Sequence, residues 1–314
     1  MVGGKVGIVG FGYWGKNQAR VFHELNSLSG IYEENLQNIK KNKSYNFFDS
    51  LDQLLDASDG IVICTPAETH YEIAVKALKN GVDILVEKPI ALNTKEVKKI
   101  IEIEKSNKAI VMVGHQLHFH PAVVKMKEII KDGKIGKIKW IYSNRLNLGK
   151  IRPYENVLWS FAPHDISLIL DFVNSEITNL EIQATKILNN KIEDTTLSLM
   201  TFKNNTKAHV FVSWIHPFKE QRFVVVGSKG SLVFSDTEEN QKKLRLFSTS
   251  ISNTGKIEKH NSKNIKVGLA EPLKEQAKYF LKSMESRKIQ VNNSKHALDV
   301  VSVLENSTKL INKV

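Results

Sequence analysis

The 314-residue chain contains one cysteine and no apolar run that approaches the length of a membrane span. A single cysteine cannot form a disulfide within the chain, which favours a reducing compartment such as the cytoplasm. Crossing a bilayer requires about 20 consecutive apolar residues, so we expect no transmembrane helix. The sequence passes from Met1 directly into the strand-like run Lys5–Val9, and we therefore also expect no signal peptide.

Arginine is scarce although the chain is strongly basic. Only six of the 45 cationic side chains are arginine, and the net charge is +12. Proteins that bind nucleic acid gather cationic residues on one face, and arginine is the side chain that best recognises phosphates and bases. The lysines here are scattered at helix-surface spacing, as between Lys95 and Lys108. We interpret the charge as a lysine-rich solvated surface and expect no nucleic-acid partner.

Strand and helix patterns alternate with short connections through the first 115 residues or so. Short apolar runs are typical of buried parallel strands, and the stretches between them repeat with a period near 3.6. One such stretch, Tyr71–Leu78, ends before Asn80 and Gly81, and Asn93 begins the next helix. This alternation predicts a doubly wound parallel sheet with right-handed crossovers. The predicted strands are Lys5–Val9, Leu28–Tyr32, Gly60–Cys64, Asp83–Val86 and Ala109–Val113.

The pattern changes after Gly114 to strands in close succession, joined in one case by a hairpin-like turn at 227–230. We therefore predict a second α+β domain with a mainly antiparallel sheet, so that the domains are residues 1–117 and 118–314. The predicted strands are Lys137–Tyr142, Ile177–Ala184, Thr196–Phe202, Lys207–Trp214, Arg222–Val226 and Ser231–Ser235. The predicted helices are Pro121–Asp132, Pro163–Phe172, Glu271–Ser286 and Ser294–Ile311.

The second sheet lacks the clean alternation of a sheet that has one wet face. In Lys207–Trp214 apolar residues occupy both sets of alternating positions, and Val224, Val225 and Val226 are apolar on both faces. Helices would cover one face and a second subunit the other. We therefore expect a homo-oligomer, either a dimer or a tetramer.

The first predicted strand leads into Gly10-Phe11-Gly12-Tyr13-Trp14-Gly15, a G-x-G-x-x-G motif that opens a helix. The first glycine permits the tight turn, the second lets the backbone approach a pyrophosphate, and the third packs the helix on the strand. An acidic residue is expected about 20 residues further on, to bind the ribose 2′-hydroxyl. Glu33 lies 23 residues after Gly10 and fits this role. The motif therefore predicts a dinucleotide site that favours NAD over NADP.

Two other predicted strand ends carry motifs that together resemble one family. Thr65-Pro66 followed by His70, and Glu87-Lys88-Pro89, combine with Gly10–Gly15 to resemble the glucose–fructose oxidoreductase/inositol dehydrogenase (Gfo/Idh/MocA) family. The resemblance covers essentially the whole chain and implies an N-terminal Rossmann domain. It also implies that Lys88 lies beside the nicotinamide and the reacting carbinol, where an ammonium stabilises alkoxide charge. The implied cofactor-binding residues are Gly10, Gly12, Tyr13, Trp14, Gly15, Glu33, Thr65, Pro66, His70, Glu87 and Lys88.

In the second domain the run Leu158–Ile166 resembles the family's region that ends in a histidine at a helix start, and His164 matches it. An imidazole has an ordinary pKa near 6.5, so His164 suits a general acid/base. Many family members carry aspartate four residues earlier, where this chain has Ser160. This departure weakens an inositol-dehydrogenase assignment.

The run Glu155–Asp165 resembles the branch of the family that acts on nucleotide sugars. This resemblance predicts oxidation at C3 of a UDP-N-acetyl-hexosamine or its uronate for glycan synthesis, with reduction of a keto sugar as the reverse reaction. Arginine and amide groups suit a ligand with phosphates and hydroxyls. The expected substrate-binding residues are His120, Arg145, Asn147, Arg152, Tyr154, Asn156 and His164.

Two alternatives remain open. A free-sugar or polyol dehydrogenase would use the same machinery, and a non-catalytic NAD-binding sensor would need neither Lys88 nor His164. The residues His115, His118 and His120 follow the predicted strand 109–113 but have no second pair of zinc ligands, so we expect no metal site.

Overall fold

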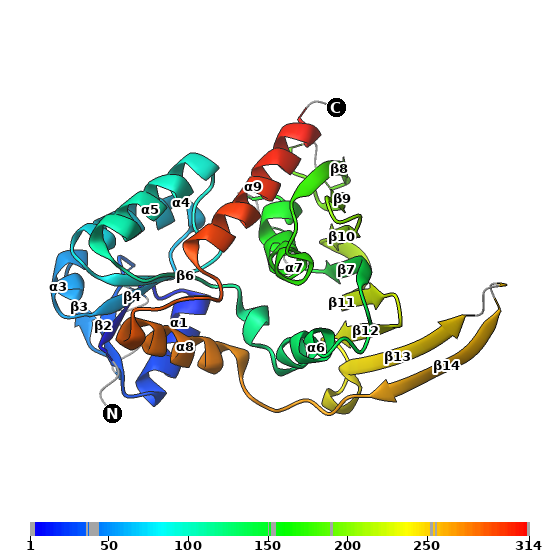
Figure 1. Cartoon of the computed structure of the whole chain (residues 1–314). Helices are drawn as coiled ribbons and strands as arrows, with labels where there is room; N and C mark the ends of the chain where they lie inside the picture. The colour runs from blue at the N-terminus through cyan, green and yellow to red at the C-terminus, as the bar shows by residue number, and fades with distance from the viewer. Residues whose placement is uncertain are drawn as a thin grey trace. The chain divides into compact units, whose positions relative to one another are not determined.

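The computed structural model describes residues 4–35, 37, 44–149, 151, 155–188, 191–251, 254 and 256–312. The chain divides into two compact units (Figure 1), and we describe each by itself. The first unit contains residues 1–116 and 271–302, and the second contains 117–270 and 303–314. The first unit thus includes residues 271–302, which the predicted ranges 1–117 and 118–314 assign to the second domain, because the helix Pro272–Ser286 packs on the helix Tyr13–Glu24.

The described part of the first unit contains a six-stranded parallel sheet of order β3-β2-β1-β4-β5-β6. Its middle strands are buried and, apart from Asp83 at the start of β5, contain only apolar residues and glycine, as expected for a parallel sheet covered on both faces. The strands are β1 (Val6–Val9), β2 (Leu28–Tyr32), β3 (Phe47–Phe48), β4 (Gly60–Ile63), β5 (Asp83–Val86) and β6 (Val111–Val113). This confirms the predicted doubly wound sheet, and β3 with α3 (Leu51–Asp56) adds a crossover that the sequence patterns did not reveal.

Helices cover both faces of this sheet (Figure 1). On one side α4 (Ala67–Lys79) and α5 (Thr94–Asn107) pack on each other, and on the other side α1 (Tyr13–Glu24) packs with α8 (Pro272–Ser286). Local chemistry sets the ends of α5, because the Asn93 side chain accepts a hydrogen bond from the Glu96 backbone N–H at 2.9 Å. The helix ends at Asn107, and Lys108 at the C-cap has the left-handed φ of 53°.

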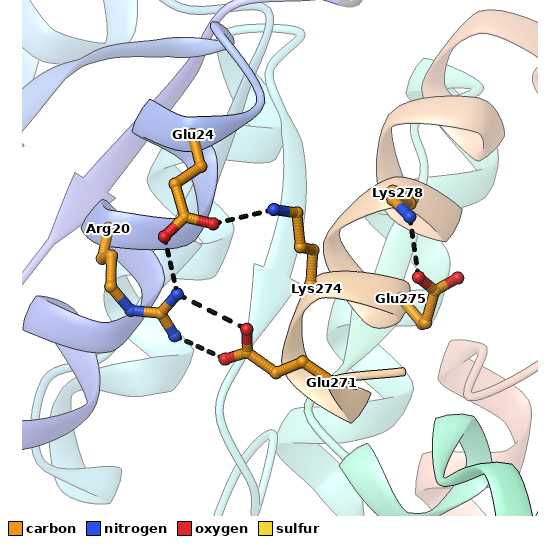
Figure 2. Close-up of polar contacts among 6 residues, drawn as sticks. All are labelled: Arg20, Glu24, Glu271, Lys274, Glu275 and Lys278. Atoms are coloured by element: carbon orange, nitrogen blue, oxygen red, sulfur yellow. Dashed lines mark hydrogen bonds and ion pairs between the residues drawn. The ribbon is translucent and has the colours of Figure 1, made fainter. Parts of the chain in front are cut away.

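Ion pairs join α8 to α1 (Figure 2). The Arg20 guanidinium binds Glu24 Oε1 at 2.8 Å and also binds the carboxylate of Glu271. The other oxygen of Glu24 lies 2.8 Å from Lys274 Nζ. These side chains are about one-third or more exposed, so the pairs orient the two helices and contribute little to stability.

The described part of the second unit contains an eight-stranded sheet of order β14-β13-β12-β11-β7-β10-β9-β8. All neighbours are antiparallel except β7 and β10, which confirms a mainly antiparallel sheet. The helices α6 (Pro121–Lys131) and α7 (Val157–Val173) cover one face of it (Figure 1). The strands are β7 (Ile138–Leu148), β8 (Ile177–Thr185), β9 (Thr195–Phe202), β10 (Lys207–Ser213), β11 (Ile215–Gly227), β12 (Gly230–Ser235), β13 (Leu244–Ile251) and β14 (Ile257–Asn264).

In the second unit one predicted helix start was wrong, and one hairpin was not predicted. The helix predicted from Pro163 begins at Val157, because Asn156 caps it and the helix accommodates the proline in its interior. The hairpin β13–β14 was not predicted, because β14 has one apolar residue in eight and so shows no strand-like alternation. The last helix α9 (Ser294–Ile311) has the predicted bounds.

We predict that Asp83 stabilises the first unit far more than the exposed charges of Figure 2. Its buried carboxylate accepts the Ile110 N–H at 2.7 Å and binds Arg287 through two nitrogens at 2.5 and 2.9 Å. The Asp83→Ala substitution leaves these donors without their acceptor and should lower the free energy of unfolding by about 2–3 kcal/mol. In urea denaturation the matched Glu24→Ala variant should change stability little. An equal loss of unfolding free energy in Asp83→Ala and Glu24→Ala would contradict the prediction.

Candidate functional site

Parallel register brings four strand ends to one edge of the first unit's sheet. Each pair of neighbouring strands is aligned at its last residue, so the residues that follow share that edge. Loops at this edge therefore gather the motifs that the sequence singled out. The aligned pairs are Val9↔Ile63, Ile63↔Val86 and Val86↔Val113.

The glycine loop between β1 and α1 has the geometry that a pyrophosphate requires. Gly10 has φ +89°, and its N–H donates to the Tyr32 carbonyl oxygen at 2.9 Å. A Cβ on Gly15 would overlap the Gly10 carbonyl oxygen, so the third glycine is required for close packing of the helix. A Cβ on Gly12 would meet nothing within 4 Å. The open space at Gly12, at the amino end of α1, fits a bound phosphate group.

Side chains of three predicted cofactor residues surround this loop. Tyr13 and Trp14 are 77% and 39% exposed, and their rings meet edge to face at 5.4 Å. Glu33 follows β2, and its carboxylate accepts the Phe11 N–H at 2.6 Å and the Asn35 N–H at 2.8 Å. The predicted acidic residue therefore lies directly against the glycine loop, where a ribose hydroxyl would bind.

His70 fastens two of the strand-end loops together. Its Nε2 lies 2.9 Å from the Thr65 carbonyl oxygen, and its Nδ1 lies 2.7 Å from the Pro89 carbonyl oxygen. The ring is 1% exposed, and burial lowers its pKa although both backbone contacts oppose the shift. Pro66 caps the amino end of α4, and the Thr69 hydroxyl donates to Thr65 Oγ1 at 2.7 Å. His70 was expected to contact the cofactor. In the structure its buried ring contacts the backbone of the two loops.

Glu87 is buried behind the same edge. Its Oε1 accepts a hydrogen bond from Gln18 Nε2 of α1 at 3.2 Å, and a Cβ on Gly114 would come within 3.0 Å of its Oε2. Burial raises the pKa of Glu87 and, together with the Glu87 charge, raises the pKa of Cys64 well above its ordinary value. A thiol in this environment is protonated and inert as a nucleophile.

Lys88 lies between these loops, half-buried, with a cis peptide bond to Pro89. Burial, together with the charges of His296 and Lys88, lowers the pKa of His115, which follows β6, well below its ordinary value. The ring of His115 meets that of His296, on α9, at 6.0 Å. The sequence motifs did not identify His296, because α9 comes more than 200 residues later and its pattern is that of an ordinary amphipathic helix.

In the second unit His164 lies in the second turn of α7, half-buried, and not at the helix start. Ser160 lies one helical turn earlier on the same face and is buried. The helix is anchored by the next residue, Asp165, whose carboxylate binds Arg145 Nε at 2.7 Å and Nη2 at 3.0 Å. The Ser143 hydroxyl also donates to Asp165 at 2.7 Å.

Several predicted substrate-binding residues have contacts within the second unit. Two nitrogens of Arg145 bind Asp165, which differs from the expected use of this side chain for a substrate phosphate. Asn156 caps α7 by accepting the Trp159 N–H at 3.1 Å and donates to Glu193 at 2.8 Å. Asn147 lies on β7 near its end. Arg152 and Tyr154 lie outside the described residues.

His120 caps α6, because its Nδ1 accepts the Ala122 N–H at 3.1 Å. Its Nε2 lies 3.6 Å from Asp236 Oδ1, and its ring packs against Phe234 at 4.8 Å. Burial lowers the pKa of His120, while Asp236 opposes that shift. These contacts hold the helix start on β12 and its following turn.

The described residues offer neither a metal-binding cluster nor a membrane-spanning helix. No group of three or more His, Cys, Asp or Glu among them is arranged to hold a metal ion. No helix in the described parts of the chain combines the length and apolarity needed to cross a bilayer.

We predict different outcomes for substitutions at Gly12 and Gly15. Gly12→Ala adds a methyl group to open space, so the protein should fold normally and bind NADH about tenfold or more weakly. Gly15→Ala adds it against the Gly10 carbonyl and should cost about 1–3 kcal/mol of stability. NADH fluorescence titration and urea denaturation distinguish the two effects. Unchanged NADH affinity in Gly12→Ala would show that the pyrophosphate does not approach this glycine.

Comparison with known proteins agrees with this geometry. Residues 4–115 match the model of an oxidoreductase family with an NAD-binding Rossmann fold, GFO/IDH/MocA, and residues 123–233 match the GFO/IDH/MocA C-terminal domain. A UDP-N-acetylglucosamine 3-dehydrogenase of Acidithiobacillus ferrooxidans is 26% identical over 217 residues, which cover 68% of each chain. An inositol 2-dehydrogenase/D-chiro-inositol 3-dehydrogenase of Lactiplantibacillus plantarum is 29% identical, covering 73% of this chain and 70% of that protein.

Solved structures share the fold of the whole chain. UDP-N-acetylglucosamine 3-dehydrogenase GnnA from Acidithiobacillus ferrooxidans matches with a TM-score of 0.90 at 20% identity, covering 100% of this chain and 99% of that chain. A levoglucosan dehydrogenase solved with NADH and L-sorbose matches with a TM-score of 0.86 at 18% identity, over 98% and 96% of the two chains. The family matches and the cofactor-loop geometry lead to one conclusion: this chain is an NAD-dependent oxidoreductase that belongs to the GFO/IDH/MocA family.

Proposed function

We propose that the protein oxidises the C3 hydroxyl of a UDP-N-acetyl-hexosamine or its uronate, with NAD as the oxidant, in the synthesis of a glycan precursor. The observation that carries the proposal is the place of Lys88, at the sheet edge that also holds the glycine loop. The 26%-identical relative named UDP-N-acetylglucosamine 3-dehydrogenase supports the choice of sugar. A cytoplasmic location is part of the proposal, since the chain has one cysteine.

Lys88 orients the reacting oxygen in this mechanism. Its ammonium donates a hydrogen bond to the sugar hydroxyl and stabilises the negative charge that develops as the proton leaves. His70 holds the loops around Lys88 through its contacts with the Thr65 and Pro89 carbonyl oxygens. The backbone that carries the lysine side chain is therefore fixed. Preorganisation of this kind lowers the barrier because the donor does not have to reorient during the reaction.

His164 acts as the general base. Its imidazole takes the hydroxyl proton while the C3–H bond breaks and the C3–O bond becomes a carbonyl. The glycine loop and Glu33 would hold NAD, which would supply the hydride acceptor. Ser160 stands where many family members carry aspartate, so in this chain Lys88 and His164 act without that carboxylate. The 3-keto product is suited to a later transamination, and the same groups would catalyse reduction of a keto sugar in reverse.

A panel of UDP-sugars, dTDP-sugars and free sugars tests the substrate. With NAD present, NADH absorbance should rise with a UDP-N-acetyl-hexosamine or its uronate. Turnover of free sugars alone would replace the proposal with a free-sugar or polyol dehydrogenase. NAD binding without turnover of any sugar would favour a sensor.

The catalytic assignments predict large effects of single substitutions. Lys88→Met and His164→Ala should each lower kcat by about 10²-fold or more, because each removes a group that acts on the reacting proton or oxygen. The exposed residues Lys98 and His260 provide matched controls, and Lys98→Met and His260→Ala should retain the full rate. A near-normal rate in either site variant would remove that residue from the mechanism.

We also propose that the chain forms a homo-oligomer through the sheet face opposite α6 and α7. On that face Tyr142 stacks on His209 at 5.4 Å, and burial lowers the pKa of His209. In the same register row Val224 and Leu199 flank this pair, and Leu199 is 39% exposed. Apolar side chains at such positions favour cover by a second copy.

Sedimentation velocity tests the oligomer. The protein should sediment as a dimer or tetramer at micromolar concentration, and Leu199→Glu should shift it toward monomer because it places a charge in the apolar row. Leu269→Glu is the matched control, since Leu269 is 88% exposed and lies outside the sheet. Monomeric wild-type protein would refute the proposal.

A further inference from the structure

Gln18 places an amide on the buried face of α1. Its side chain is 0% exposed, and Gly15, Ala19 and Phe22 belong to the same buried part of the helix. Its Nε2 donates to Glu87 Oε1 at 3.2 Å. Its Oε1 has no hydrogen-bond partner among the described residues. A buried amide oxygen without a partner costs free energy, so packing alone does not explain a glutamine at this position.

Glu87 follows β5 and is held by three other elements of the first unit. Its N–H donates to the Ile63 carbonyl oxygen of β4 at 2.9 Å. A Cβ on Gly114 would lie 3.0 Å from its Oε2, so the backbone after β6 confines the carboxyl on that side. Among the described residues Gln18 is the one side chain that donates to this carboxyl. Because α1 packs on β1, β2 and β4, the bond connects this helix to the loop after the next strand of the sheet.

The Glu87 carboxyl is joined directly to Lys88. The two residues are adjacent in sequence, and the carboxyl forms a hydrogen bond with the Lys88 backbone. On the other side of the lysine the Pro89 carbonyl oxygen lies 2.7 Å from His70 Nδ1. Glu87 therefore fixes the backbone before the lysine side chain, and His70 fixes the backbone after it.

We propose that Gln18 is a positioning residue for Lys88, that it acts through the Glu87 carboxyl, and that this link sets the lysine relative to the glycine loop that opens α1. The kinetic consequence of this inference rests on the proposed function. Without the Gln18 donor the carboxyl rotates away and the Lys88 backbone loses its acceptor. The ammonium stands on a flexible four-carbon stem, so it then meets the sugar oxygen in the reactive geometry less often.

Hydrogen exchange tests the link without cofactor or sugar. In the full-length protein Gln18→Met keeps an unbranched side chain of similar length and removes its N–H donor. Backbone amides in peptides that span residues 84–92 should exchange about tenfold faster, because the Lys88 backbone loses its fixed acceptor. Gln18→Asn keeps a buried amide that is one methylene too short to reach Glu87, so it should give the same increase. Unchanged exchange in either variant overturns the inference.

Three further variants distinguish the link from a general loss of packing. Gln276 on α8 is equally buried, and its amide has no hydrogen-bond partner among the described residues, so Gln276→Met should leave the exchange of residues 84–92 unchanged. Glu87→Gln still offers an oxygen to Gln18 and should exchange like the wild type. Glu87→Met offers none and should exchange as fast as Gln18→Met. Fast exchange in Gln276→Met, or wild-type exchange in Glu87→Met, overturns the inference.

Kinetics then test the consequence for Lys88. Gln18→Met should lower kcat by about tenfold and change KM for the sugar by less than about twofold, because a misplaced ammonium affects the chemical step more than binding. Gln276→Met should retain the wild-type kcat. A raised KM with an unchanged kcat in Gln18→Met overturns the inference. If the wild type oxidises no sugar while the exchange link is present, the proposed function fails and the positioning of the Lys88 backbone by Gln18 stands.

Discussion

The parallel register of β1, β4, β5 and β6 is the constraint on which the first unit's chemistry depends. Backbone hydrogen bonds align the strands at their last residues, so each following loop begins at the same edge. The glycine loop, the His70 contacts and Lys88 are neighbours for this reason, although up to about 80 residues separate them in sequence. A shift in register would separate these groups without changing any local motif.

Buried polar contacts hold the functional elements, and exposed ones only orient helices. Asp165 is almost fully buried and binds Arg145 and Ser143 of β7. These contacts fix α7 to the sheet at the residue that follows His164. Asp83 does the same for the segment that contains Arg287. In low-dielectric surroundings an unpaired charge is costly, so these carboxylates specify one arrangement of their partners. The four-residue network between α1 and α8 is solvated and specifies much less.

The sequence motifs of the first unit lie at the strand ends where local patterns placed them, whereas two expected substrate-binding residues of the second unit bind groups of their own chain. The glycines, Glu33 and Lys88 occupy short-range patterns whose geometry follows from a strand, a turn and a helix. Arg145 and Asn156 have chemistry that suits a ligand, yet their described contacts are with Asp165 and Glu193. The chemistry of a side chain does not show whether it is available to a ligand or already binds another residue of its own chain.

By itself, the sequence determined the two kinds of sheet, the position of the dinucleotide loop and the lysine that follows β5, because each depends on local periodicity or on turn chemistry. The tertiary structure decided that residues 271–302 belong with the first unit and that His296 stands beside His115. It also decided that α7 begins at Val157, with Pro163 in its interior. Those features depend on contacts between segments distant in sequence, and the energy of such contacts leaves no periodic pattern in the residues that make them.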